Sequence, residues 1–267
     1  MIVREEGEHL VLVRQADHGL LSGWLAGAWG EQPWAVPEPY DSTVVGARLH
    51  DLAWTSFDEA LPCRPDGRPY AFHEVSRSVT TRLYGRGIDA VEAIDEYAGL
   101  LTSLHFSGFV TSHWGWPPVA SSVGLATEER EAVDRFLQDE AGRQEGLRDR
   151  LGVDATLDRQ LMCNYFWLQL WDRISLDVCR RGFIGWTGEY PPTPVETQPG
   201  AEEVRLQIEL HPEGVCRLAP YPLRFDPFTA RVPAVRVPHT GPGEHAALRR
   251  AWRSGGGDAI EVTFRPG

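Results

Sequence analysis

The pattern of apolar and polar positions changes along the chain, from strand-like alternation to helical repeats and back to short strands. Residues 2–14 alternate on either side of the sequence EGEH, which predicts a β-hairpin. From 17 to 29, apolar side chains recur at steps of three and four, the spacing of one helix face. The positions on that face are Leu20, Leu21, Trp24 and Ala28.

The same helical spacing continues over the middle of the chain. We expect a helix that Asp41 or Ser42 caps and that continues through Asp51, and further helices over 88–105, 127–151 and 154–182. The last of these is apolar nearly all round between Leu161 and Leu176, which predicts a central position. Residues 60–78 are loop-like and contain the turn sequence PDGRP.

Beyond Gly182 the composition changes. Residues 185–203 are rich in proline, glycine and glutamate and predict a connector. Strand-like runs follow at 204–210, 215–225, 230–238 and 259–264. We therefore predict a mainly α fold with a small antiparallel β appendage: a helical domain at 16–184 and a β unit at 185–267, which the hairpin at 1–15 joins because chain ends often meet.

Composition and charge narrow the function classes. The net charge of −12 disfavours nucleic acid and anionic membrane surfaces as partners. The 26 basic residues are all arginine, which excludes Schiff-base lysine chemistry and a P-loop lysine. The four cysteines form no CxxC pair. There is no signal-peptide pattern and no apolar run of about 18 residues, so we expect a soluble, cytoplasmic, bacterial protein.

Asp172 is the main chemical anomaly, because it lies in the most apolar helix of the chain. A bare carboxylate in such a place is costly unless it is paired or bound to a cation. Steps of three or four residues along the helix meet no basic side chain; they meet Leu168, Gln169, Ser175 and Leu176. The partner of Asp172 must therefore come from another segment.

Three other residues supply such a partner. His18 begins the first predicted helix, and His50 and Asp51 are adjacent in the next one. With Asp172, they make two neutral imidazoles and two carboxylates, which balance the charge of a divalent cation and leave coordination positions for water and substrate. The sequence therefore predicts a site for a divalent metal ion such as Mn, Mg, Fe, Zn, Ni or Co.

The order of these residues resembles the HD-domain superfamily of metal-dependent phosphohydrolases. That superfamily is defined by a histidine, an adjacent His-Asp pair and a distant aspartate on a late helix, and ARLHDLAW and LWDRISL are similar to its last two segments. The likeness covers roughly residues 16–182. It implies an HD-like helical bundle in which Asp51 also orients the attacking water as a base.

A closer resemblance is to a bacterial family known as a domain of unknown function, DUF3891. The chain shares with it the opening MIVREEGEHLVLVRQADH and segments that read here as HDLAW, SLHFSG and DRISLDVC. This likeness extends over most of the chain and implies no established activity. The departure is Leu52-Ala53, at the place where the family is expected to have Asp-Gly.

These features together predict a metal-dependent phosphohydrolase that acts on a small phosphorylated molecule, with Asp51 as the catalytic residue. Candidate anion-binding side chains are Arg48, Arg77, Arg82 and Arg86. The expected partner is a small-molecule substrate, and we expect neither nucleic acid nor a membrane as a partner. The sequence leaves the oligomeric state open.

Two alternatives remain open. Some HD-type proteins, including diiron oxygenases of the inositol oxygenase kind, hold a second metal with two extra histidines, and here His105 and His113 lie in the matching interval. On one continuous helix these two would be about 12 Å apart, too far for one compact cluster. The other alternative is a degenerate HD fold that serves as a non-catalytic sensor or interaction module, which the Leu52-Ala53 departure favours.

Overall fold

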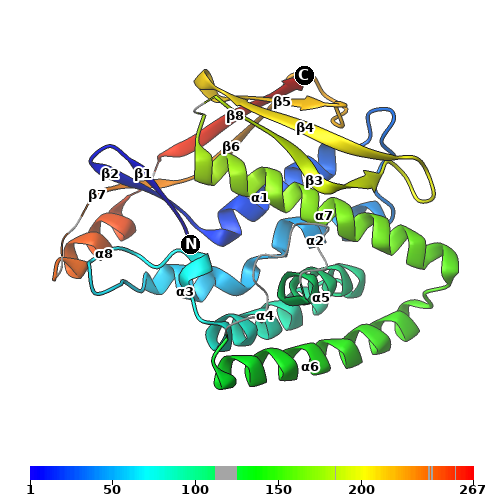
Figure 1. The fold of residues 1–267 in the computed structure, drawn as a ribbon, viewed down its shortest axis with the longest axis horizontal. Coiled ribbons are helices and arrows are strands. Elements are labelled where there is room, and N and C mark those ends of the chain that lie inside the picture. The colour runs from blue at the N-terminus through cyan, green and yellow to red at the C-terminus, as the bar shows by residue number, and fades with distance from the viewer. Residues whose placement is uncertain (112–124, 184, 240, 242, 256) are drawn as a thin grey trace.

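A computed structural model describes residues 1–111, 125–183, 185–239, 241, 243–255 and 257–267, with the backbone alone for 189–194. Its longest helix, α7, lies between two layers (Figure 1). A five-stranded sheet covers one side of α7, and a group of helices covers the other. A smaller sheet and the last helix lie at one end of the molecule.

The helices in the described residues follow much of the predicted pattern. Their bounds are α1 Gln15–Ala28, α2 Tyr40–Leu49, α3 Thr55–Ala60, α4 Arg77–Glu92, α5 Glu96–Thr111, α6 Thr127–Leu151, α7 Ala155–Arg181 and α8 His245–Ser254, with short 3-10 turns η1 Leu52–Trp54, η2 Phe72–Glu74 and η3 Pro212–Gly214. The helices expected at 127–151 and 154–182 are thereby confirmed. Asp154 caps α7, because its carboxylate accepts the backbone N–H groups of Thr156 and Leu157. Asp41 and Ser42 do not cap α2, which begins after Pro39.

The single helix expected over 88–105 was wrong, because α4 ends at Glu92 and α5 begins at Glu96. Asp95 Oδ1 accepts the N–H of Ala98 at 2.8 Å, which gives α5 its own capped start. Gly99 lets the two helices meet closely, since a Cβ there would lie 2.7 Å from Glu92 Cα. The apolar spacing ran on across this corner, but Ile94 is 60% exposed and belongs to neither core face.

The strands form two sheets. Their bounds are β1 Ile2–Glu6, β2 His9–Val13, β3 Trp186–Glu196, β4 Glu203–His211, β5 Val215–Ala219, β6 Phe228–Pro233, β7 Val235–Pro238 and β8 Ala259–Pro266. The predicted hairpin is confirmed as the antiparallel pair of β1 and β2. It pairs with β7 in a sheet of order β1-β2-β7, while the larger sheet has the order β3-β4-β5-β8-β6.

The purely antiparallel β appendage was wrong, because β5 and β8 run parallel in the larger sheet. A parallel pair needs a long crossover connection. The chain between these strands supplies one through β6, β7 and α8, and the sequence pattern had not predicted α8.

The predicted connector at 185–203 is in large part strand β3, which pairs with β4. The pairing register shifts between Tyr190 and Val195, and the residues between them read PPTP. Proline has no N–H to donate to a sheet, so a strand that carries three of them has the composition of a connector.

One hydrophobic cluster runs through both the helical and the β segments. It includes Leu25, Leu101 and Trp171 from the helices, and Leu206 and Val262 from the larger sheet. The predicted central position of α7 follows from this arrangement, because its side chains are buried toward the sheet on one side and toward the helices on the other.

Helices α1 and α2 approach each other closely at two glycines of α1. A Cβ on Gly19 would lie 2.8 Å from the carbonyl oxygen of Arg48, and one on Gly23 would lie 2.7 Å from Arg48 Cβ. The two glycines are four residues apart, so they share one face of α1. Through this contact, α1 packs against the last turn of α2, immediately before His50.

Replacing Gly19 by alanine is expected to destabilise the fold by about 1–3 kcal/mol, because the added methyl group overlaps backbone atoms that do not move freely. Denaturant unfolding monitored by circular dichroism measures this. Gly142 on α6 is the matched control, since it has open space around it, and Gly142→Ala is expected to stabilise by roughly 0.5–1 kcal/mol. A stabilising Gly19→Ala would contradict the close packing of α1 on α2.

Candidate metal centre

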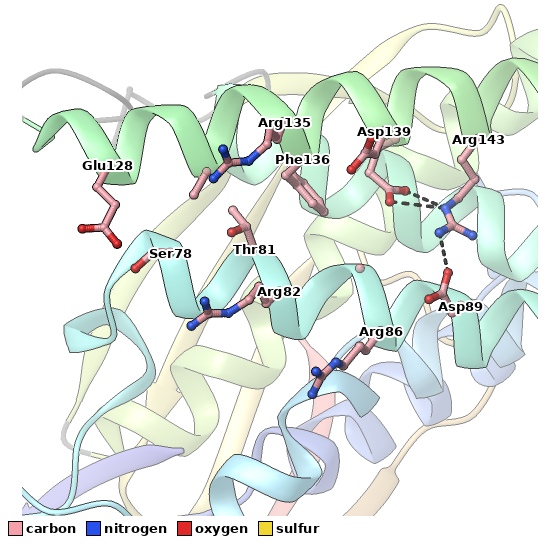
Figure 2. A pocket seen from close by; sticks show the side chains of 13 residues that line it. Ser78, Thr81, Arg82, Arg86, Asp89, Glu128, Arg135, Phe136, Asp139 and Arg143 are labelled. Atoms are coloured by element: carbon pink, nitrogen blue, oxygen red, sulfur yellow. Dashed lines mark hydrogen bonds and ion pairs between the residues drawn. The ribbon is translucent and has the colours of Figure 1, made fainter.

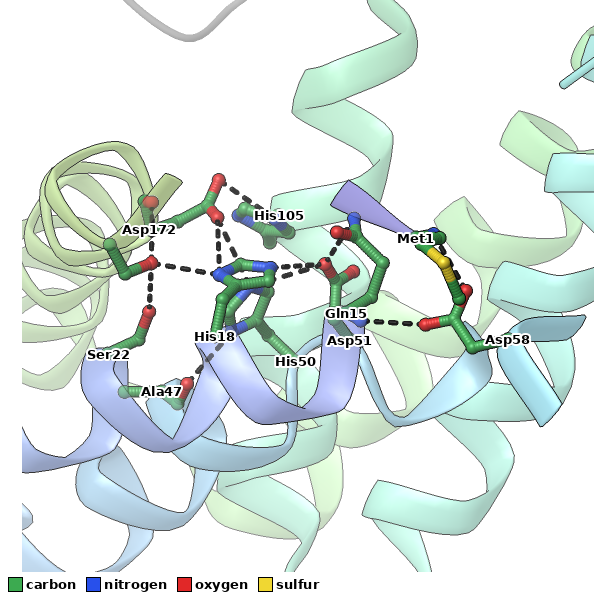
Figure 3. A network of polar contacts seen from close by, with 11 residues as sticks. Met1, Gln15, His18, Ser22, Ala47, His50, Asp51, Asp58, His105 and Asp172 are labelled. Carbon is green, nitrogen blue, oxygen red and sulfur yellow. Dashed lines mark hydrogen bonds and ion pairs between the residues drawn. The ribbon is translucent and has the colours of Figure 1, made fainter. Parts of the chain in front are cut away.

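Five side chains from four parts of the chain converge beside α7. His18 comes from the first half of α1, His105 from α5 and Asp172 from α7. Helix α2 ends at Leu49, so His50 and Asp51 lie in the bend before η1 and not within a helix as expected. Figure 3 shows all five side chains directed toward a common point.

The cluster is almost completely shielded from solvent. His18 is 0% exposed and Asp51, the most exposed of the five, is 7% exposed. Carboxylates in such surroundings require a cation, a proton or several hydrogen bonds. The interactions of each side chain therefore indicate what the site is built to hold.

Asp51 receives contacts from two residues of α1. Its Oδ2 atom lies 2.8 Å from Nε2 of His18 and accepts a hydrogen bond of 3.1 Å from the amide nitrogen of Gln15. Gln15 is fixed in turn by Asp58, which accepts the backbone N–H of Gln15 at 2.7 Å. The carboxylate of Asp58 also lies 2.7 Å from the amino group of Met1 (Figure 3). These contacts fix the carboxylate of Asp51 against α1.

His50 has its two ring nitrogens in different surroundings. Nδ1 lies 2.8 Å from the carbonyl oxygen of Ala47, and a carbonyl can only accept, so Nδ1 carries the proton. Nε2 then faces Oδ1 of Asp172 at 3.3 Å and Oδ2 of Asp51 at 3.8 Å, and it forms no hydrogen bond within the described part of the chain. An imidazole nitrogen buried beside two carboxylates calls for a positive charge at that place, which either a proton or a metal ion supplies.

His105 lies on the far side of Asp172. Its Nε2 atom is 3.9 Å from Oδ2 of Asp172, and its ring centre is 5.0 Å from that of His50. His105 is a possible second-metal or pocket residue in the sequence, and the structure brings it to the cluster. The companion residue, His113, lies outside the described residues.

The electrostatics of the cluster are strongly coupled. Burial opposes a charge on His50, but the carboxylates of Asp51 and Asp172 outweigh it and raise the pKa of His50 to about 9. Burial likewise opposes the charge of Asp172, but the contact with His50 lowers its pKa to about 2. For His105, burial dominates and lowers the pKa to about 4. In the absence of a metal ion, a proton on His50 therefore supplies the missing positive charge.

The candidate ligand atoms form two groups of three, each close enough together to hold a cation. His18, His50 and Asp51 form one group whose candidate ligand atoms all lie within 4.8 Å of one another, and His50, His105 and Asp172 form another. Imidazole nitrogens and carboxylate oxygens are common ligands of divalent first-row metals. Among the described residues, these groups can therefore hold a metal ion.

The four candidate arginines are spread over the surface. Arg82 and Arg86 are exposed and line a groove of about 510 Å³ between α4 and α6 (Figure 2). Arg48 is exposed and packs over Gly23. Arg77 lies over the ring of Phe109 on α5, the helix that carries His105.

Sequence reasoning missed several residues that support the cluster: Gln15, Ser22, Asp58 and Ser175. Helical spacing was the available signal for three of them. Gln15 precedes His18 by three positions, Ser22 follows it by four, and Ser175 follows Asp172 by three. Residues at these steps lie on one helix face, so a hydroxyl or amide there is placed to touch the same site.

The Leu52-Ala53 departure has a packing context. A Cβ on Gly87 of α4 would lie 2.5 Å from Cβ of Ala53, so α4 rests directly on the start of η1. With alanine at position 53, this contact requires glycine at position 87. Nothing in the structure explains leucine at position 52.

Comparisons with known proteins identify a family whose function is unknown. A family model described as "Protein of unknown function (DUF3891)" matches residues 1–239. No curated protein and no solved structure is significantly similar to the chain. Within the described residues, no helix has both the length and the apolar character needed to cross a membrane.

Proposed function

Because the chain belongs to this family of proteins of unknown function, we propose an activity from the chemistry of the site: metal-dependent hydrolysis of a phosphoric ester of a small molecule. We further propose that the ligand set is of the HD type. Its support is the order of the ligands along the chain, with His18 on α1, the pair His50-Asp51 after α2, and Asp172 on the late helix α7.

The observation that carries the proposal is the direction of the ligand atoms. Nε2 of His50 faces Asp51 and Asp172 while its Nδ1 proton is held by a backbone carbonyl. Two carboxylates gathered around such a nitrogen repel its lone pair unless a positive charge lies between them. With a divalent cation, the two carboxylates leave the buried site neutral.

A divalent cation held by His18, His50, Asp51 and Asp172 would polarise a phosphoryl oxygen and lower the pKa of a bound water. Asp51 uses Oδ2 for its contacts with His18 and Gln15, and it is the most exposed member of the cluster. Its other oxygen is therefore suited to orient the attacking water and accept its proton.

Arg77 is the best supported anion anchor of the four arginines. Burial raises the pKa of Tyr84, the charges of Asp51 and Asp172 raise it further, and the charge of Arg77 lowers it. Tyr84 thus lies within electrostatic reach of both Arg77 and the cluster. An arginine at this place would attract the phosphoryl group toward the carboxylates that hold the metal.

The direct test combines metal analysis with a phosphoesterase panel. The purified protein, reconstituted separately with Mn²⁺, Fe²⁺, Co²⁺, Ni²⁺, Zn²⁺ and Mg²⁺, is assayed on p-nitrophenyl phosphate, bis-p-nitrophenyl phosphate and small phosphorylated metabolites. We expect at least one metal to bind in a near-stoichiometric amount and to support turnover. Metal binding without turnover on the whole panel would favour the non-catalytic sensor, and no metal binding at all would overturn the site.

Replacing Arg77 by glutamine is expected to raise the KM of that reaction about tenfold and to leave kcat within about threefold of the wild-type value. The reason is that Arg77 would interact with the charge of the substrate and would not bind the metal. Steady-state kinetics measure this. Arg82→Gln and Arg86→Gln are matched controls on the same helix, since both side chains line the α4–α6 groove, and both are expected to behave as wild type. Equal effects of all three changes would remove Arg77 from the site.

A second candidate function, a diiron oxygenase of HD type, is favoured by the position of His105. Its Nε2 atom lies 3.9 Å from the second oxygen of Asp172, so this carboxylate can be shared between two metals. Two irons per chain in the anaerobically reconstituted protein, together with oxygen consumption, would support this candidate. A single metal per chain that is unaffected by His105→Ala would exclude it.

A further inference from the structure

Two buried serines connect the helices that carry His18 and Asp172. Ser22 lies one turn after His18 on α1, and Ser175 lies one turn after Asp172 on α7. Their Oγ atoms are 3.0 Å apart, and both residues are 0% exposed. Each of these two helices therefore pairs a candidate ligand with a hydroxyl group on the same side, and the two hydroxyl groups meet.

The protons of this contact can be counted. The hydroxyl group of Ser175 donates to the carbonyl oxygen of Asp172 at 2.8 Å, and a serine has a single proton to donate. Its oxygen must then accept in its other two contacts, from Ser22 at 3.0 Å and from Nδ1 of His18 at 2.9 Å. This count puts a proton on Nδ1 of His18, so Nε2, which lies 2.8 Å from Oδ2 of Asp51, is the nitrogen left to bind a metal ion.

We propose that Ser175, supported by Ser22, is a positioning residue that fixes the tautomer and the ring orientation of His18 for metal binding. The inference rests on the proposed metal centre. The backbone carbonyl of Ala47 has the same role for His50. Both histidines therefore carry a proton on Nδ1 and direct Nε2 toward the carboxylates, one through a serine and the other through a backbone carbonyl. Since a backbone carbonyl is not removed by substitution, Ser175 is the contact at which this role can be measured.

Ser175→Ala is expected to weaken Zn²⁺ binding about 10- to 100-fold, the usual effect of losing a hydrogen-bond partner behind a ligand. Competition against a chromophoric chelator measures the affinity without any need for activity. Ser22→Ala is expected to have a smaller effect in the same direction, because Ser175 can still accept from His18.

Ser103→Ala is the matched control for the loss of a buried hydroxyl group. Ser103 lies on α5, is 0% exposed and donates to Oε2 of Glu140 at 2.8 Å. Its variant is expected to lose thermal stability to a similar degree as Ser175→Ala and to keep the wild-type affinity for Zn²⁺. If Ser175→Ala also keeps that affinity, the serine pair is structural and the inference is overturned.

The tautomer can also be observed without a variant. In the Zn²⁺-loaded wild-type protein, ring nitrogen NMR is expected to find His18 protonated at Nδ1, and a proton at Nε2 would overturn the inference even if Ser175→Ala failed to fold. These outcomes differ from failure of the proposed function. If wild-type protein binds none of the six metals, the metal centre itself is wrong, whereas wild-type binding with an unaffected Ser175→Ala refutes the positioning role alone.

Discussion

Asp172→Asn is expected to lower the affinity for the metal ion by at least about 100-fold, the upper end of what supporting contacts around a metal cost. The amide keeps the volume of the side chain but loses the charge, so the site no longer balances a divalent cation. Metal content after dialysis and chelator competition measure the effect, and any phosphoesterase activity is expected to fall with it.

Asp177→Asn is the matched control for this change. Asp177 is a buried carboxylate on the same helix, 1% exposed, and its ion pairs are with Arg173 and Arg181. Its loss is expected to lower thermal stability and leave metal affinity unchanged. If both asparagine variants weaken metal binding equally, the effect arises from damage to α7, and Asp172 is not a ligand.

The second large effect is a dependence of metal binding on pH. The pKa of His50 is about 9 because burial, which opposes its charge, is outweighed by Asp51 and Asp172. A metal ion must displace this proton from Nε2, so affinity is expected to rise about tenfold per pH unit from pH 7 to 9 and to level off above pH 9. Near pH 7.5, about one proton is released per metal bound, and His105, with a pKa of about 4, adds none.

Isothermal titration calorimetry in buffers of different ionisation enthalpy measures the number of protons released. His211→Gln is the control, since His211 pairs with Glu209 in the β segment and both side chains are partly open to solvent, and it is expected to leave the release unchanged. Affinity that does not change between pH 7 and 9 would contradict the competition between proton and metal at His50.

The same pKa shift makes the stability of the metal-free protein depend on pH. The pKa of His50 in the fold, about 9, is raised above its ordinary value of 6.5. Its contribution to stability is therefore fully present below about pH 6.5 and is lost as the pH rises through 9. A bound metal replaces that proton, so the increase in melting temperature on adding metal is expected to grow over the same range.

Much of the candidate site could be predicted from local sequence. Asp172 is conspicuous because its helix is apolar nearly all round and offers no basic residue at helical spacing. The order His18, His50-Asp51 and Asp172 then suggested partners. In the fold, Asp51 lies 2.8 Å from His18, and Asp172 lies 3.3 Å from His50.

Other features depended on contacts that sequence patterns do not contain. Arg77 and Arg82 are equivalent candidates in the sequence, but one lies over Phe109 and the other lines the α4–α6 groove. The break between α4 and α5 was hidden because apolar spacing continued across it, and β3 was hidden by its prolines. The contact of Arg77 with Phe109 joins residues that are distant in the chain. The α4–α5 corner instead depends on local contacts of Asp95 and Gly99 that the apolar spacing concealed.

The sequence by itself determined that α7 is central and that a carboxylate buried on it needs a partner from another segment, because periodicity and burial cost are local properties. It did not determine every apolar face, since Trp24 was expected on the buried face of α1 and is 37% exposed. Only the tertiary structure decided which groups meet that carboxylate and which nitrogen each histidine presents. Those outcomes follow from the close packing of α1 against α2 at Gly19, and from the hydrogen bonds that the rings of His50 and His18 form with Ala47 and Ser175.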